Sequence, residues 1–185
     1  SNDDVISFIN GKTGVPQLWK YRRSNNELDQ ITDFDRGIEA YDISPSGNQF
    51  VVVARVGDYS SRKIFCIDVK DCNTDQITHQ EDAHHYWGDW KSDGQAFCFV
   101  RRRKGKKIFE VCVNDFDDSK ILYESNDVVS ISNWCADGDR LLIREHKPDG
   151  SHKIIILDAK NGNIIWELQH QQSCVFENLY ISPHG

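Results

Sequence analysis

The chain has 185 residues, 38% of them hydrophobic, which is enough for one or two domains with a core of their own. Its formal net charge of −7 argues against nucleic-acid binding, and no apolar run approaches the roughly 18 residues that a membrane span needs. No signal-peptide pattern opens the sequence and no methionine occurs in it, so we expect a processed or excised piece of a protein without membrane partners.

Short strand patterns alternate with turns from residue 4 onward, and no segment has the period of a helix. The first predicted strand, 4–9, is followed by a turn at 10–14, because Asn-Gly and similar dipeptides favour turns. Two further strands follow at 17–21 and 27–32. The same order recurs in three more units, with predicted strands at 49–55, 63–69 and 75–78, at 95–101, 107–113 and 119–124, and at 139–146, 152–159 and 163–168.

Each unit ends on one short motif, in which an aromatic or apolar residue precedes a polar turn that contains glycine. The four copies are YDISPSGN at 41–48, DWKSDGQ at 89–95, NWCADGD at 133–139 and LYISPHG at 179–185, and their glycines are 47, 44 and 47 residues apart. Glycine suits such a corner because a tight hairpin requires a residue at positive φ, which is unfavourable for a side chain with a Cβ. A repeat of roughly 40–50 residues made of strands is typical of a β-propeller.

The sequence therefore predicts an all-β protein, a β-propeller of about four blades with four antiparallel strands each, as part of a larger propeller. We expect one propeller domain or fragment over 1–185, with blade units at about 4–47, 48–94, 95–138 and 139–185. Trp90 and Trp134 hold equivalent corner positions, and their counterparts are Tyr41 and Tyr180. We expect these rings to pack between blades rather than to form a stacking platform for nucleic acid.

The six cysteines include no Cys-x-x-Cys pair, the spacing typical of a zinc site or a redox dithiol. Cys66, Cys98, Cys112 and Cys135 lie inside or beside apolar strand patterns, where a free thiol behaves as a small hydrophobic residue. Cys66 and Cys72 could also pair across one hairpin. We favour reduced thiols in the core of a cytoplasmic protein over a disulfide framework.

One polar cluster is a candidate metal site. His79, Glu81, Asp82, His84 and His85 supply the ligand types that metals accept. No helix sets their spacing, however, and adjacent residues of an extended segment point to opposite sides. We therefore favour a polar loop between blades and predict no metal site.

A second cluster is the run 101–107, with six basic residues in seven positions. A solvated hairpin tip is the favoured interpretation, and the alternative is a site for an acidic partner or nucleic acid. Antiparallel strand order places this run and the segment 79–85 on one face of the propeller, and all glycine corners on the other. That face is the candidate docking surface. Its predicted site residues are His84, His85, Arg101, Arg102 and Arg103.

Segments in colinear order over nearly the whole chain carry a resemblance to a known family. They are GVPQLW at 14–19, QITDF at 30–34, SPSG at 44–47, HHYWGDWKSDG at 84–94, IFEVCV at 108–113 and RLLIR at 140–144. They are similar to the N-terminal propeller of the prolyl oligopeptidase family of serine peptidases, in its acylaminoacyl-peptidase and dipeptidyl-peptidase-like branch. TolB-like propellers share the Ser-Pro-Asp-Gly corner, from which this sequence departs at Ser46, Ser92, Ala136 and His184.

In that family the catalytic serine, aspartate and histidine lie in an α/β-hydrolase domain after the propeller. This sequence contains no Gly-x-Ser-x-Gly motif, and no Glu-Glu pair with which some dipeptidyl peptidases hold the substrate amine. The resemblance therefore implies no catalytic residue and no cofactor in this chain. It implies a non-catalytic propeller region that gates substrate access and docks the hydrolase domain, with peptide substrate or that domain as partner. The alternative is a TolB-like protein-interaction scaffold without a hydrolase domain.

The chain begins at a predicted second strand, 4–9, and ends at a predicted first strand, 177–183. Pairing of these two strands would close four blades into a small ring, whereas a larger parent ring would keep them apart. We expect the open arc, with exposed apolar blade faces and unpaired edges that favour self-association. The distance between Ile6 and Ile181 distinguishes the two arrangements.

Overall fold

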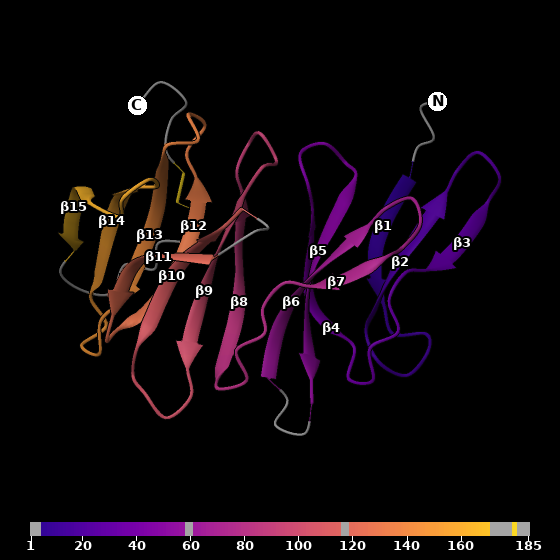
Figure 1. Cartoon of the computed structure of the whole chain (residues 1–185), viewed down its shortest axis with the longest axis horizontal. Coiled ribbons are helices and arrows are strands. Elements are labelled where there is room, and N and C mark those ends of the chain that lie inside the picture. The colour runs from indigo at the N-terminus through magenta and orange to yellow at the C-terminus, as the bar shows by residue number, and fades with distance from the viewer. Residues whose placement is uncertain (1–4, 58–60, 116–118, 171–178, 181–185) are drawn as a thin grey trace. The chain divides into compact units, whose positions relative to one another are not determined.

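The computed structural model describes residues 5–57, 61–115, 119–170 and 179–180. In these ranges the regular structure is entirely β-sheet, as the sequence predicts: fifteen strands form one three-stranded and three four-stranded antiparallel sheets (Figure 1). The chain divides into two compact units, Ser1–Glu81 and Asp82–Gly185. None of the described residues belongs to a helix long and apolar enough to cross a membrane.

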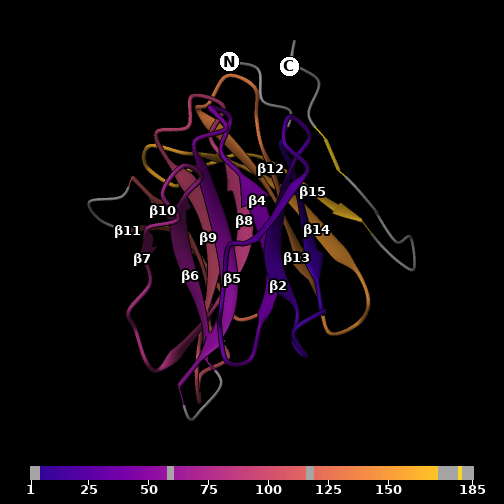
Figure 2. The ribbon, with the colours of Figure 1, turned by 90° about the vertical axis from the view of Figure 1, so that its right-hand side faces the viewer.

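The unit Ser1–Glu81 contains two sheets whose strands follow one another in chain order. The first sheet consists of β1 (Val5–Asn10), β2 (Gln17–Arg22) and β3 (Glu27–Gln30). The second consists of β4 (Ile38–Ile43), β5 (Gln49–Val56), β6 (Ser61–Asp68) and β7 (Thr74–Gln76). Figure 2 shows β4 to β7 side by side in this order.

The unit Asp82–Gly185 repeats this arrangement with two four-stranded sheets. The first consists of β8 (Ala83–Trp90), β9 (Phe97–Arg103), β10 (Phe109–Asn114) and β11 (Ser119–Ser125). The second consists of β12 (Val128–Trp134), β13 (Arg140–His146), β14 (His152–Asp158) and β15 (Ile164–His170). Almost every strand predicted from the sequence is present within a few residues of its expected bounds.

The glycine corners have the predicted conformation wherever the structure describes them. Gly47, Gly94 and Gly138 have φ of 72°, 70° and 69°. At each corner the glycine N–H donates to the carbonyl oxygen three residues earlier, at 2.8–2.9 Å. Gly185, the fourth predicted corner, lies outside the described residues.

Each glycine corner joins the first two strands of one sheet. The boundaries of the sheets therefore fall one strand earlier than the boundaries of the predicted blade units, which end at the glycines. The strands before the corners, β4, β8 and β12, pair with β5, β9 and β13 after them. A unit such as 48–94 thus contains three strands of one sheet and the first strand of the next. The physical reason is that a tight hairpin turn keeps both of its strands in the same sheet.

The core of each unit lies between its two sheets. In Asp82–Gly185, Cys98 and Val111 of the first sheet belong to one cluster with Leu141 and Ile155 of the second. Trp134 joins this cluster at 7% exposure, as predicted for a corner ring between blades. Two of the other three corner rings are also packed: Tyr41 lies against the core of Ser1–Glu81, and Trp90 is buried. Tyr180 differs, because its side chain is 75% exposed.

The cysteines of the described ranges are free thiols. Cys66, Cys98, Cys112 and Cys135 are buried, which confirms the prediction of core thiols. Cys72 is free and half-buried, so it does not pair with Cys66. Cys174 lies outside the described residues.

Apolar side chains are exposed on the first and last described strands. Ile6 of β1 is 50% exposed, and Ile165 and Trp166 of β15 are 53% and 47% exposed. Self-association through such surfaces stays a prediction. The predicted pairing partner of β1, the segment 177–183, lies mostly outside the described residues, and Ile181 with it.

Candidate docking surface

The register of β8 and β9 brings all five predicted site residues together at one end of the first sheet of Asp82–Gly185. The paired residues are His84 with Arg102, His85 with Arg101, and Ala83 with Arg103. The N–H of Lys104 also donates to the carbonyl oxygen of Asp82 at 2.6 Å, so the basic turn contacts the end of the 79–85 segment. The Gly94 corner lies at the opposite end of the same two strands (Figure 1). Within this unit, residues 82–85 therefore lie beside the start of the basic run; that the whole segment 79–85 forms a docking face with this run stays a prediction.

Two of the five side chains are buried and therefore not available to a partner. His85 is 0% exposed and packs against Phe99, with ring centroids 5.7 Å apart, and Arg101 is 6% exposed. The structure differs from the prediction at these two positions because alternate side chains of a strand point to opposite faces, and theirs is a covered face. Of the five predicted residues, the candidate docking surface keeps His84, Arg102 and Arg103, and we add Lys104, Lys106 and Lys107 from the same basic run, none of which is buried.

A buried ion pair explains how Arg101 is accommodated. Its Nε donates to Oε2 of Glu110, and Nε of Arg103 lies 2.8 Å from Oε1 of the same carboxylate. Burial acts to raise the pKa of Glu110, but the hydrogen bonds and charges of the two arginines outweigh it and hold that pKa below its usual value. Glu110 therefore stays ionised and fixes the base of the basic turn.

The five residues considered as metal ligands are divided between the two units: His79 and Glu81 belong to Ser1–Glu81, and the other three to Asp82–Gly185. In the described ranges, no group of three or more histidine, cysteine, aspartate or glutamate side chains lies close enough to hold a metal ion. His79 and Glu81 line a pocket of Ser1–Glu81 together with Lys63, whose ammonium group would compete with a cation. His85 is buried against Phe99 instead.

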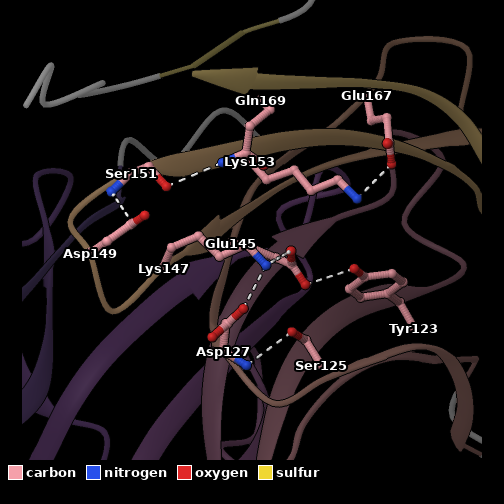
Figure 3. A network of polar contacts seen from close by, with 10 residues as sticks. All are labelled: Tyr123, Ser125, Asp127, Glu145, Lys147, Asp149, Ser151, Lys153, Glu167 and Gln169. Atoms are coloured by element: carbon pink, nitrogen blue, oxygen red, sulfur yellow. Dashed lines mark hydrogen bonds and ion pairs between the residues drawn. The ribbon is translucent and has the colours of Figure 1, made fainter. Parts of the chain in front are cut away.

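A polar network at the same end of Asp82–Gly185 joins its two sheets (Figure 3). The hydroxyl of Tyr123, on β11, donates to Oε1 of Glu145, on β13, at 2.7 Å. Lys147 lies 3.2 Å from the other oxygen of Glu145 and 2.6 Å from Asp127, which belongs to the connection between the sheets. On the next strands, Lys153 pairs with Glu167 at 2.6 Å. The network connects β11, β13 and the linking segment, so it stabilises the relative position of these two sheets.

The charges of this network are strongly coupled. Burial would raise the pKa of Glu145, but hydrogen bonds from Ser125, Tyr123 and Lys147 hold it below its usual value. Burial and the Glu145 carboxylate both raise the pKa of Tyr123, because each disfavours the phenolate. The hydrogen bond to Asp127, together with Glu145, raises the pKa of Lys147. Tyr123 is thus neutral and Glu145 charged near pH 7.

The structure also contains a serine–histidine contact that the sequence did not indicate. Oγ of Ser130 lies 3.1 Å from Nε2 of His146, and Nε of Arg144 donates to the same nitrogen at 3.2 Å. A catalytic histidine must accept the serine proton on this nitrogen, but here Arg144 occupies its lone pair. Burial, Arg144 and His152 all lower the pKa of His146. Ser130 therefore shares this acceptor with Arg144, and the contact is not a nucleophile paired with a free base.

No protein-family model matches this sequence, and no curated protein sequence matches it. Solved structures do match. TolB from Acinetobacter baumannii superposes with a TM-score of 0.64 at 16% identity, over 86% of this chain and 40% of that one. An oligogalacturonate lyase from Vibrio parahaemolyticus gives 0.69 at 11% identity, over 86% and 48%. A prolyl endopeptidase, analysed for the role of inter-domain dynamics in catalysis and specificity, gives 0.67 at 10% identity, over 89% and 28%.

These similarities establish the fold: the four sheets are blades, and the chain is a partial β-propeller, as the glycine corners predict. Peptidase and TolB-like propellers are both among the similar structures, in line with the resemblance seen in the sequence. The chain spans 40% and 48% of the length of the first two structures that it matches. The fold alone follows from identities this low.

Proposed function

We propose that this chain is the non-catalytic propeller region of a serine peptidase, where it gates substrate access and docks the hydrolase domain. The observation that carries the proposal is the likeness of its blades to a prolyl endopeptidase structure, at a TM-score of 0.67 over 89% of the chain. The colinear segments of the sequence that resemble the same family support it independently.

The charged end of Asp82–Gly185 is the part of the chain suited to docking. Interfaces between domains that separate and close again are more polar than permanent ones. Arg102, Lys106 and Lys107 are exposed there, and Arg103 is half-buried. An acidic patch on the hydrolase domain would meet this surface with salt-sensitive affinity, because exposed charge pairs are screened by salt.

A TolB-like scaffold without a hydrolase domain is the second candidate, favoured by the match to TolB at a TM-score of 0.64. The sequence of the full-length parent protein separates the two candidates. A Gly-x-Ser-x-Gly motif within a few hundred residues after Gly185 supports the peptidase, and its absence from the whole parent supports the scaffold.

Gating is tested in the full-length parent enzyme by the ratio of its activities on a folded protein substrate and a short chromogenic peptide. Lys107→Glu should raise this ratio, since it weakens the closed arrangement, and the effect should disappear at about 0.5–1 M salt. Lys160→Glu is the matched control, because it reverses a charge at the opposite end of the same unit, where Lys160 is 77% exposed. An equal effect of both variants, or none from Lys107→Glu, would refute gating through this surface.

The isolated chain should not hydrolyse acyl-aminoacyl or dipeptidyl chromogenic substrates under any of these conditions. Turnover that survives purification and is blocked by a serine-directed phosphonate would show a nucleophile within the chain and overturn the non-catalytic assignment.

A further inference from the structure

An apolar pocket lies between the two blades of Asp82–Gly185. Its volume is about 320 Å³, at the lower end of the roughly 300–1,000 Å³ that small-molecule sites occupy. One wall includes the rings of Tyr86 and Phe109, and the opposite wall is residues 128–131 of β12. Of the residues in this wall, Val128 is 50% exposed and Val129 is 5% exposed.

Arg102 is the one charged residue that lines this pocket. The pairing register places Arg102 between His84 and Phe109 in one row across the sheet, with Val100 in the next row on the same face. Its guanidinium carbon lies 5.6 Å from the centroid of the Phe109 ring, a cation–π distance that holds the side chain over the pocket.

The three consecutive arginines of β9 differ in their partners. Arg101 and Arg103 point to the other face of the sheet, and both pair with the buried Glu110. Arg102 has no carboxylate partner among the residues that the structure describes, and its side chain is exposed. The pocket therefore combines aromatic and branched apolar walls with a positive charge that the described part of the protein does not neutralise.

A glycine lies next to the lining residues Trp87 and Ile131. A Cβ at Gly88 would lie 2.8 Å from Cδ1 of Ile131, a lining residue, and 2.6 Å from the carbonyl oxygen of Cys98. Only glycine allows β8 and the Ile131 side chain to approach so closely. The two blades thus come into close contact at Gly88, beside the pocket.

We propose that this pocket binds a small carboxylate with an apolar body, whose carboxylate pairs with Arg102 and whose aromatic or branched side chain fills the space beside Tyr86 and Phe109. A guanidinium offers two parallel N–H donors that match a carboxylate, and such a pair is stronger than a neutral hydrogen bond. The same chemistry is presented by a free apolar acid and by the C-terminus of a peptide that ends in a large apolar residue. The inference goes beyond the peptidase proposal and does not depend on it, because binding is measured on this chain without a hydrolase domain.

The probe is N-acetyl-L-phenylalanine, titrated into the 185-residue chain by calorimetry and by ligand-observed NMR. A ligand of this size binding with ordinary efficiency should have a Kd of about 0.1–1 mM. N-acetyl-L-phenylalanine amide, which lacks the carboxylate, should bind at least about tenfold more weakly, and acetate should not bind measurably. A pentapeptide that ends in phenylalanine then separates the sources: comparable binding assigns a peptide C-terminus, and loss of binding assigns the free acid.

Two variants test the site in the folded protein, with circular dichroism to verify folding. Arg102→Gln should weaken binding of N-acetyl-L-phenylalanine by about tenfold or more, and Val128→Glu, which places a carboxylate in the pocket lining, should abolish it. Lys160→Gln removes the same charge from an exposed position far from the lining residues and should change Kd less than about twofold. The proposal is overturned if the probe does not bind at about 10 mM, if the amide binds as well as the acid, or if Arg102→Gln binds like the wild type.

Discussion

Tyr123→Phe removes one hydroxyl from the network between the two blades of Asp82–Gly185 and leaves the ring in place. That hydroxyl donates a 2.7 Å hydrogen bond to Glu145, whose side chain is 4% exposed (Figure 3). A hydrogen bond to a charged group contributes about 1.5–3 kcal/mol to stability. Lys147 remains at 3.2 Å from Glu145, so the carboxylate keeps one strong partner. We therefore expect the free energy of unfolding to fall by about 2 kcal/mol.

The loss should depend on pH with a definite sign. The pKa of Tyr123 is raised in the folded state by burial and by Glu145. Its contribution to stability is therefore complete below the ordinary tyrosine pKa of about 10, and is lost as the pH rises through the higher folded-state value. The difference between the wild type and Tyr123→Phe should be constant from about pH 6 to 9 and should shrink above pH 10.

Urea unfolding followed by circular dichroism measures both quantities. Tyr21→Phe is the control, because Tyr21 donates a 2.8 Å bond to the neutral side chain of Asn26 at an exposed site, and its loss should cost about 0.5 kcal/mol or less. If Tyr123→Phe costs no more than Tyr21→Phe, or if its cost is the same at pH 7 and above pH 10, the assignment of this hydrogen bond as a stabilising link between blades is wrong.

Three further predictions use matched positions. Glu110→Gln should lower the free energy of unfolding by about 3–5 kcal/mol, because it leaves a buried arginine without its counter-charge. Glu39→Gln, which lies between two arginines at the surface, should lower it by about 1 kcal/mol or less. Equal losses in urea unfolding would contradict this. Gly162→Ala should lower the free energy of unfolding, measured in urea, by about 1–3 kcal/mol more than Gly150→Ala. Both glycines have positive φ, but a Cβ at 162 would lie 2.1 Å from the carbonyl oxygen of Leu122 on β11, whereas a Cβ at 150 would have no atom within 4 Å. Among the five cysteines that the structure describes, Cys72 should react first with a thiol reagent in the folded chain, because burial raises the pKa of the core thiols. All six cysteines should react after denaturation without reductant; two or fewer would indicate disulfides.

The architecture could be predicted because it is repeated. The Gly47 corner and its copies mark one turn type at one period, and period-two patterns around them locate the strands. The phase of the blades follows from the same corners, because a tight hairpin turn keeps the strands before and after it in one sheet.

The site could be predicted only in part. Strand order places the turn after β9 beside residues 82–85, as the pairing of β8 with β9 shows, but burial of His85 and Arg101 depends on which face of the sheet is covered. A local signal did exist, because Glu110 interrupts the apolar strand FEVCVN and a buried carboxylate requires a counter-charge. The contact of Tyr123 with Glu145 had no such signal, since it joins residues of two sheets whose packing sets the distance.

Every described sheet is made of strands that are consecutive in the sequence. The hydrogen bonds of one blade therefore close only short loops, which carry a small entropy cost and favour fast folding. Since each of the three four-stranded blades takes its described strands from one stretch of the chain, such a blade can complete its pairing before the next is synthesised, and stability spreads from neighbour to neighbour. Cleavage in the connections at 31–37, 77–82 or 126–127 would accordingly release whole hydrogen-bonded blades rather than halves of them.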